Sequence, residues 1–60
     1  MEATGGVHVV KPGESLWRIA ERAVGRARAS GYVDEIVRLN GIDDPSRVRA
    51  GQKLVLPPNQ

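Results

Sequence analysis

The sequence contains no cysteine, so neither a disulfide framework nor a thiolate metal site can stabilise the chain. Trp17 and Tyr32 are its only aromatic residues, and we therefore expect a core built from aliphatic side chains. Long hydrophobic runs are also lacking, because segments such as 54–56 are far too short to span a bilayer. The 60 residues form one small domain at most. Its small core favours a shallow groove over an enclosed active site.

Charge is present in both signs and the formal net charge is only +2, which by itself does not imply a nucleic-acid partner. Both ends are polar or rich in glycine and proline. We expect residues 1–6 to be a flexible leader without the features of a signal peptide and residues 58–60 to be a tail. The domain itself is then expected to span residues 7–57.

The first half of the chain predicts a strand, a turn and a helix. The β-branched run 7–10 ends at Pro12-Gly13, a strong turn signal. Ser15, or Glu14 before it, is suited to cap a helix that stops at Gly25. The apolar positions of this helix recur at helical spacing on one face: Leu16, Ile19, Ala20, Ala23 and Val24.

The second half predicts a helix followed by a strand. Residues 26–31 are interpreted as a polar connector, in which Ser30 caps the next helix. Asp34 and Glu35 are then expected near the positive end of that helix. Asn40-Gly41 is a strong helix-end signal, and a turn over 43–46 with a short 3₁₀ segment precedes a strand over 52–56. The apolar stripe of the second helix is expected from Val33, Ile36, Val37 and Leu39.

The predicted order of strand, helix, helix, strand indicates an α+β protein. Two strands alone are marginal in water, so they need a packed helical layer. The simplest arrangement pairs the terminal strands antiparallel and places both helices on one face of the ribbon.

At this point the sequence resembles a LysM (lysin motif) domain over nearly its whole length. The family pattern is matched in its first half by His8, Val10, Gly13, Glu14, Ser15, Leu16, Ile19 and Ala20. It is matched in its second half by Ile36, Asn40, Val48, Gly51, Leu54, Leu56 and Pro57. The resemblance implies a βααβ fold that binds glycans containing N-acetylglucosamine, such as peptidoglycan or chitin oligomers.

The resemblance also implies a shallow groove between two loops. Its candidate ligand-binding residues are Gly13, Glu14, Ser15 and Leu16 in the first loop and Asn40, Gly41, Ile42 and Asp43 in the second. Glycines let the main chain approach an acetamido group closely, and a helix N-terminus offers free N–H groups. Leu16 and Ile42 are expected to provide the apolar surface that contacts the methyl group of the acetamido group. Asn40 is expected mainly to cap the second helix and brace the loop.

Three departures from the family pattern stand out, of which the mildest is Glu14-Ser15 in place of the usual Asp-Thr. His8 replaces the usual strand tyrosine, and the segment between residues 20 and 40 is longer than in compact family members. That longer segment looks like LysM domains of actinobacterial cell-wall and cell-division proteins.

Single residues leave a choice between a binding and a structural role. Trp17 can stack on a sugar, but packing along the apolar helix face is the favoured interpretation. His8, a lone strand histidine without a visible partner, is interpreted as structural. Arg18, Arg22 and Arg26 recur every four residues. They can meet anionic wall polymers or nucleic acid, although a solvated face is favoured.

Catalysis is not expected. The sequence offers no nucleophile with a base and an orienting group, and no pair of carboxylates predicted to face each other across a cleft. No cofactor and no metal are expected.

The leading hypothesis is a non-catalytic, monomeric module that targets a larger protein to the cell wall by binding N-acetylglucosamine-containing glycan. One alternative is a LysM-fold interaction or structural module without sugar binding. The other is a nucleic-acid binder that uses the arginine stripe, with the helices taken as a helix-turn-helix.

Overall fold

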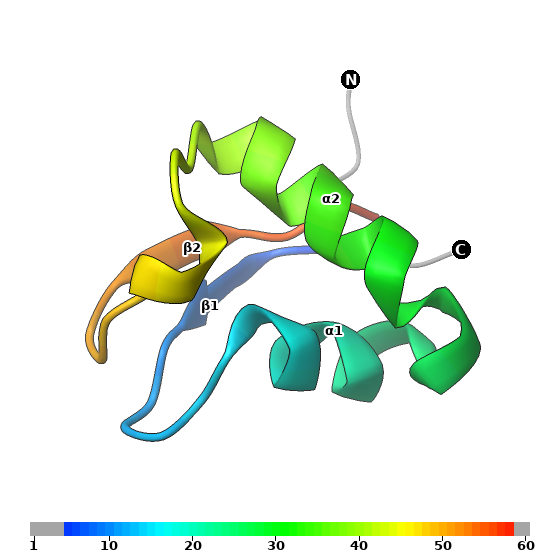
Figure 1. The fold of residues 1–60 in the computed structure, drawn as a ribbon, viewed down its shortest axis with the longest axis horizontal. Helices are drawn as coiled ribbons and strands as arrows, with labels where there is room; N and C mark the ends of the chain where they lie inside the picture. Colours follow the sequence, from blue (N-terminus) through cyan, green and yellow to red (C-terminus); the bar gives the residue numbers. More distant parts are fainter. Residues whose placement is uncertain (1–4, 59–60) are drawn as a thin grey trace.

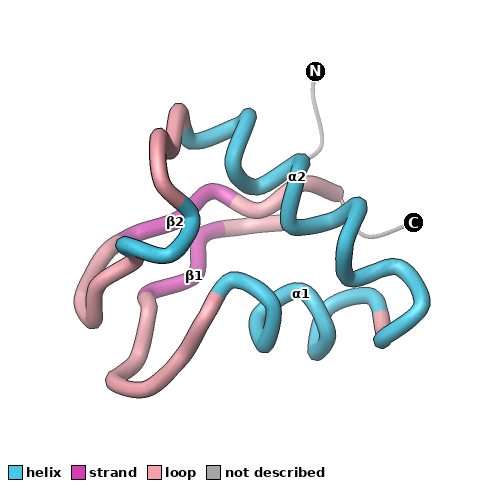
Figure 2. Tube along the Cα trace, viewed as in Figure 1, coloured by secondary structure: helices cyan, strands magenta, loops and turns pink. Residues whose placement is uncertain are grey.

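The protein, described over residues 5–58 by a computed structural model, has the predicted βααβ arrangement (Figure 1). Its strands are β1 (Val7–Val9) and β2 (Lys53–Val55), and its helices are α1 (Leu16–Val24) and α2 (Ala29–Asn40). Two short 3₁₀ segments, η1 (Arg26–Arg28) and η2 (Pro45–Arg47), precede α2 and β2 (Figure 2). The short 3₁₀ segment that the sequence predicted before the last strand is therefore present as η2.

The two strands pair antiparallel, as the sequence predicts. Their register places three residue pairs opposite each other: Val7 with Val55, His8 with Leu54, and Val9 with Lys53. Side chains alternate between the two faces of a strand, so Leu54 points to one face and its neighbours to the other. Leu54 is fully buried, whereas Val7, Val9 and Val55 are exposed on the opposite face.

Backbone pairing continues past the strands at the N-terminal end. The N–H of Gly5 donates to the carbonyl of Leu56 at 2.7 Å, and the N–H of Leu56 donates to the carbonyl of Gly6 at 2.8 Å. A Cβ on Gly5 would clash with the carbonyl oxygen of Pro57. These two residues of the expected leader are thus bonded to the fold, while positions 1–4 and 59–60 lie outside the described residues.

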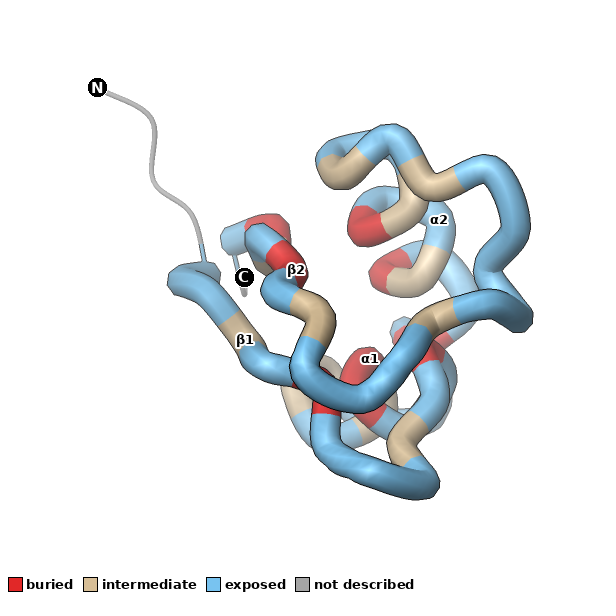
Figure 3. The backbone as a smooth tube through the Cα atoms, turned by 90° about the vertical axis from the view of Figure 1, so that its left-hand side faces the viewer, coloured by how far each residue is buried: buried red, intermediate tan, exposed pale blue. Residues whose placement is uncertain are grey.

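The core lies between the ribbon and the two helices, both of which cover the same face (Figure 3). Its buried residues are Val10, Leu16, Ile19, Ala20, Ala29, Tyr32, Ile36 and Leu54. The expectation of a purely aliphatic core was wrong at Tyr32. Its ring is buried and its hydroxyl donates to the carbonyl of Pro57 at 2.8 Å, which satisfies the polar end of the side chain.

The first helix follows the prediction closely. The Ser15 hydroxyl accepts the N–H of Arg18 at 3.2 Å, which caps α1. Gly25 ends the helix with φ of 86°, and its N–H bonds back to Glu21 at 2.8 Å. Local sequence chemistry alone accounts for both ends.

The start of the second helix differs from the prediction. Ser30 caps nothing, because η1 leads directly into α2 at Ala29 and Ser30 lies inside the helix. The earlier start leaves Asp34 and Glu35 outside the first turn. Leu39, expected on the apolar stripe, is 49% exposed, whereas Ile36 is fully buried as expected.

Candidate functional site

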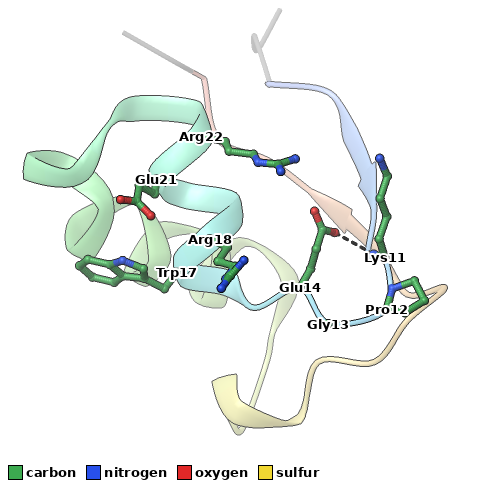
Figure 4. A pocket seen from close by; sticks show the side chains of 8 residues that line it. All are labelled: Lys11, Pro12, Gly13, Glu14, Trp17, Arg18, Glu21 and Arg22. Carbon is green, nitrogen blue, oxygen red and sulfur yellow. Dashed lines mark hydrogen bonds between the residues drawn. The ribbon is translucent and has the colours of Figure 1, made fainter.

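The loop between β1 and α1 is a tight turn closed by two hydrogen bonds. The N–H of Glu14 donates to the carbonyl of Lys11 at 3.0 Å, and the N–H of Lys11 donates to Glu14 Oε1 at 2.7 Å (Figure 4). Gly13 has φ of 83°, a conformation that favours glycine. Beyond its chain neighbours, no heavy atom lies within 4 Å of the place a Cβ would take there. The main chain at Gly13 is therefore open to approach.

His8 has a partner that the sequence did not reveal. Its Nε2 lies 2.9 Å from Glu14 Oε1, so β1 holds the loop through the same carboxylate that closes it. The Lys11 backbone N–H, followed by the His8 hydrogen bond, holds the pKa of Glu14 below its usual value. The expectation that His8 stands without a neighbouring acid was wrong because the turn brings position 14 back beside the strand. Glu14, predicted as a ligand contact, already uses Oε1 within the loop.

Leu16 and Ser15 contribute to this loop in different ways. Leu16 is only 3% exposed and belongs to the core, so its side chain cannot provide the apolar contact with the sugar that was expected of it. Ser15 is exposed, but its hydroxyl caps α1. At these two positions the backbone offers more to a ligand than the side chains do.

The second loop begins at a left-handed helix end, as predicted. Gly41 has φ of 61°, and its N–H and that of Ile42 bond back to Arg38 and Val37 at 3.4 and 3.0 Å. No heavy atom beyond the chain neighbours lies within 4 Å of a Cβ placed on Gly41. Ile42 is half-buried and Asp43 is exposed. Here the main chain and the Ile42 side chain border open surface.

Asn40 has the supporting role that was expected for it. Its side-chain amide donates to the carbonyls of Ile36 and Val55, both at 2.8 Å, and its oxygen accepts the N–H of Val55 at 2.8 Å. The amide oxygen and nitrogen are thus both used inside the fold. Asn40 joins the end of α2 to β2 and fixes where the second loop starts.

The two loops lie on the same side of the molecule, at the left in Figure 1, but line separate hollows. The first hollow, of about 580 Å³, is lined by Lys11, Pro12, Gly13, Glu14, Trp17, Arg18, Glu21 and Arg22. The second, of about 340 Å³, is lined by Asn40, Gly41, Ile42, Asp43, Asp44, Arg47 and Gln52. Six of the eight candidate residues therefore border one hollow or the other, whereas Ser15 and the buried Leu16 border neither.

Trp17 is exposed, contrary to the packing role favoured from the sequence. Its side chain is 46% exposed and borders the first hollow together with Lys11, Arg18 and Arg22 (Figure 4). Site prediction from the family pattern omitted these residues. Sequence signals existed for three of them, namely the regular spacing of Arg18 and Arg22 and the capacity of Trp17 to stack on a sugar, but none pointed to Lys11.

Within residues 5–58, no group of three or more histidine, cysteine, aspartate or glutamate side chains is placed to hold a metal ion. Over the same residues, every helix is too short or too polar to cross a membrane.

Comparison with known families gives the decisive match. The model of the LysM domain matches residues 8–57, which covers both strands, both helices and both candidate loops. This chain belongs to the LysM family. LysM domains are generally modules that bind peptidoglycan or N-acetylglucosamine and do not catalyse reactions.

A curated relative carries the same type of domain. The chain is 43% identical over 53 residues to the "Uncharacterized lipoprotein YgeR" of Escherichia coli (strain K12). The match covers 88% of this chain but only 19% of the relative, so the chain spans about a fifth of that lipoprotein's length. No solved structure matches the chain significantly. LysM domains occur in cell-envelope proteins, as the lipoprotein relative illustrates.

Proposed function

We propose that this LysM domain binds N-acetylglucosamine units of peptidoglycan between the loop 13–16 and the loop 40–43, and thereby targets a larger protein to the cell wall. The domain proper extends over residues 7–57 and acts as a monomer. Chitin oligomers contain the same sugar units, so they are expected to occupy the same groove.

The observation that carries this proposal is the open backbone at Gly13 and Gly41. Both residues lie in loops on one side of the molecule, and neither has a heavy atom where a Cβ would stand, apart from chain neighbours. An acetamido group needs a backbone donor and acceptor at close range together with an apolar contact for its methyl group. The half-buried side chain of Ile42 supplies that apolar surface beside Gly41.

The fold also bears on the alternatives. Binding nucleic acid through a helix-turn-helix loses its support, because the helices are the middle of a βααβ fold with paired terminal strands. A LysM fold without sugar binding is the alternative that the following titration separates from the proposal.

A titration with a tetramer of N-acetylglucosamine, followed by backbone amide NMR, tests the function. We expect millimolar or tighter binding with shifts at 13–16 and 41–43, and little change at Gly25. A glucose tetramer of the same length, which lacks the acetamido groups, is the ligand control and should shift neither loop. Absence of shifts in both loops at millimolar N-acetylglucosamine tetramer would contradict the proposal.

A pair of variants tests the apolar contact. Ile42→Ala removes about three methyl or methylene groups, and partial loss of their contact should weaken binding by roughly fivefold. Leu39→Ala is the matched control, because Leu39 is exposed and borders neither of the two hollows. Equal affinities of the two variants would show that Ile42 does not contact the sugar.

A further inference from the structure

We propose that the first hollow is a subsite for the free lactyl carboxylate of an N-acetylmuramic acid residue that carries no stem peptide; this sugar alternates with N-acetylglucosamine in peptidoglycan. This inference rests on the proposed function and extends it, because it names the chemistry recognised next to the N-acetylglucosamine groove. The hollow is bordered by the first loop and by one face of α1.

Three cationic side chains surround this hollow. Lys11 borders it from the loop that follows β1, and Arg18 and Arg22 border it from successive turns of α1 (Figure 4). All three residues are exposed, and within residues 5–58 none of them forms an ion pair. Arg26, the next residue of the same stripe, instead pairs with Glu21 at 3.4 Å and does not border the hollow. Of the three arginines in this stripe, Arg26 is therefore paired, whereas Arg18 and Arg22 are available to bind an anion.

The two acids that border the hollow already have partners. Glu14 Oε1 accepts hydrogen bonds from the Lys11 backbone and lies against His8. Glu21 faces the Arg26 guanidinium. Three positive and two negative side chains border the hollow, which leaves one net positive charge, and of the two acids Glu21 is paired with a cation outside the hollow. A carboxylate entering the hollow would consequently meet a local excess of unpaired positive charge.

The second hollow has the opposite character. It contains Asp43 and Asp44 with a single cation, Arg47, which pairs with Asp44 at 3.5 Å. A glycan chain that runs from one loop to the other thus meets an acidic hollow at the second loop and a basic hollow at the first. Because like charges repel, an acidic sugar is favoured beside Gly13 and a neutral one beside Gly41. This charge difference gives the bound glycan a direction.

The size and donor geometry of the first hollow suit such a group. Its volume of about 580 Å³ lies within the range of ordinary ligand sites. Guanidinium groups present planar, paired donors that match the two oxygens of a carboxylate. Gly13 and Glu14 border this hollow and also form part of the proposed groove, so one glycan chain can reach both the hollow and the groove.

Three tetrasaccharides of equal length test the subsite. They are the N-acetylglucosamine tetramer, the alternating N-acetylglucosamine and N-acetylmuramic acid tetramer with free carboxylates, and the same alternating tetramer as its methyl ester. Exposed charge pairs are individually weak, so we expect the free acid to bind about three- to tenfold more tightly than the ester. Raising the salt concentration should shrink this ratio.

Variants locate the effect. Arg18→Gln and Arg22→Gln should each lower the ratio of acid to ester affinity, and the double variant should bring it close to one. Arg38→Gln is the matched control, because Arg38 is exposed, lies on α2 and borders neither hollow. It should leave the ratio unchanged. Thermal melts of all variants verify that each one is folded.

The outcomes separate the two proposals. Equal binding of acid and ester, with the N-acetylglucosamine tetramer still bound, overturns the carboxylate subsite and leaves the proposed function standing. An acid preference that Arg38→Gln lowers as much as Arg22→Gln overturns the subsite as well, since it reflects net charge alone. Failure of the N-acetylglucosamine tetramer to bind contradicts the proposed function itself.

Discussion

Asn40 illustrates how a single residue can look like a ligand contact and serve the fold instead. Its amide pairs with both backbone groups of Val55 and with the carbonyl of Ile36. Asparagine is suited to this position because one short side chain carries an acceptor and two donors in a plane. The pairing extends the hydrogen bonding of β2 on the side away from β1, where a free strand edge would otherwise remain.

Replacing Asn40 should therefore affect stability. Asn40→Ala removes three hydrogen bonds at a partly exposed position, and we expect a loss of about 1–3 kcal/mol in the free energy of unfolding. Asp43→Ala, three residues further at an exposed position, should change it by less than about 0.5 kcal/mol. Urea unfolding of both variants provides the measurement. Similar unfolding midpoints would contradict the bracing role.

At the scale of elements, the two helices begin in different ways. Ser15 caps α1 directly. The chain reaches α2 through the 3₁₀ segment η1, whose first hydrogen bond runs from the N–H of Arg28 to the carbonyl of Gly25 at 3.3 Å. The helical path is thus already under way before Ser30. A serine followed by an apolar pattern indicated a cap there, but the preceding 3₁₀ turn made one unnecessary.

The two serines form a matched pair for testing this difference. Ser15→Ala removes the hydroxyl that accepts the Arg18 N–H and should destabilise the protein by about 1 kcal/mol. Ser30→Ala should leave stability unchanged or raise it by roughly 0.5 kcal/mol, because alanine is the better helix former. Thermal and urea unfolding compare the two. If Ser30→Ala destabilises the protein as much as Ser15→Ala, the result would support the helix-capping role that the sequence predicted for Ser30.

For the whole molecule, stability rests on a single small core. Among residues 5–58, eight buried hydrophobic residues make up this core, and Ile36 and Leu54 are its largest completely buried side chains. A domain of 60 residues has a total stability of about 3–9 kcal/mol, so the loss of one such side chain matters. Tyr32 adds a further link, since its hydroxyl attaches α2 to the segment that follows β2.

Substitutions on the two sides of α2 test this dependence on one core. Ile36→Ala should cost about 2–5 kcal/mol and leave a large unfolded population, while the milder Ile36→Val should cost about 1 kcal/mol. Leu39→Ala should cost less than about 1 kcal/mol, because Leu39 is half exposed. Urea unfolding monitored by circular dichroism measures all three. A cost at Leu39 equal to that of Ile36→Val would contradict the observed orientation of α2.

Much of the fold could be predicted because it depends on interactions between residues close in sequence. The Ser15 cap, the glycine ends of both helices and the order of elements all follow from local chemistry. The candidate loops were located by the family pattern, and the structure places both on one side. The role of each side chain in them was less predictable, because it depends on which way the residue points. Leu16 turned into the core and Trp17 turned out of it.

The sequence by itself determined that this protein is a βααβ LysM domain with glycine turns at the start and end of its helical layer. The tertiary structure alone decided how the site is divided. Folding brings Glu14 back beside His8 and places Lys11, from the loop after β1, at the same hollow as Arg18 of α1. These contacts join different elements, so they depend on how strand, loop and helix pack against one another. Helical spacing places Arg18 and Arg22 on one face of α1, but the hollow that they border forms only when the first loop packs beside that helix.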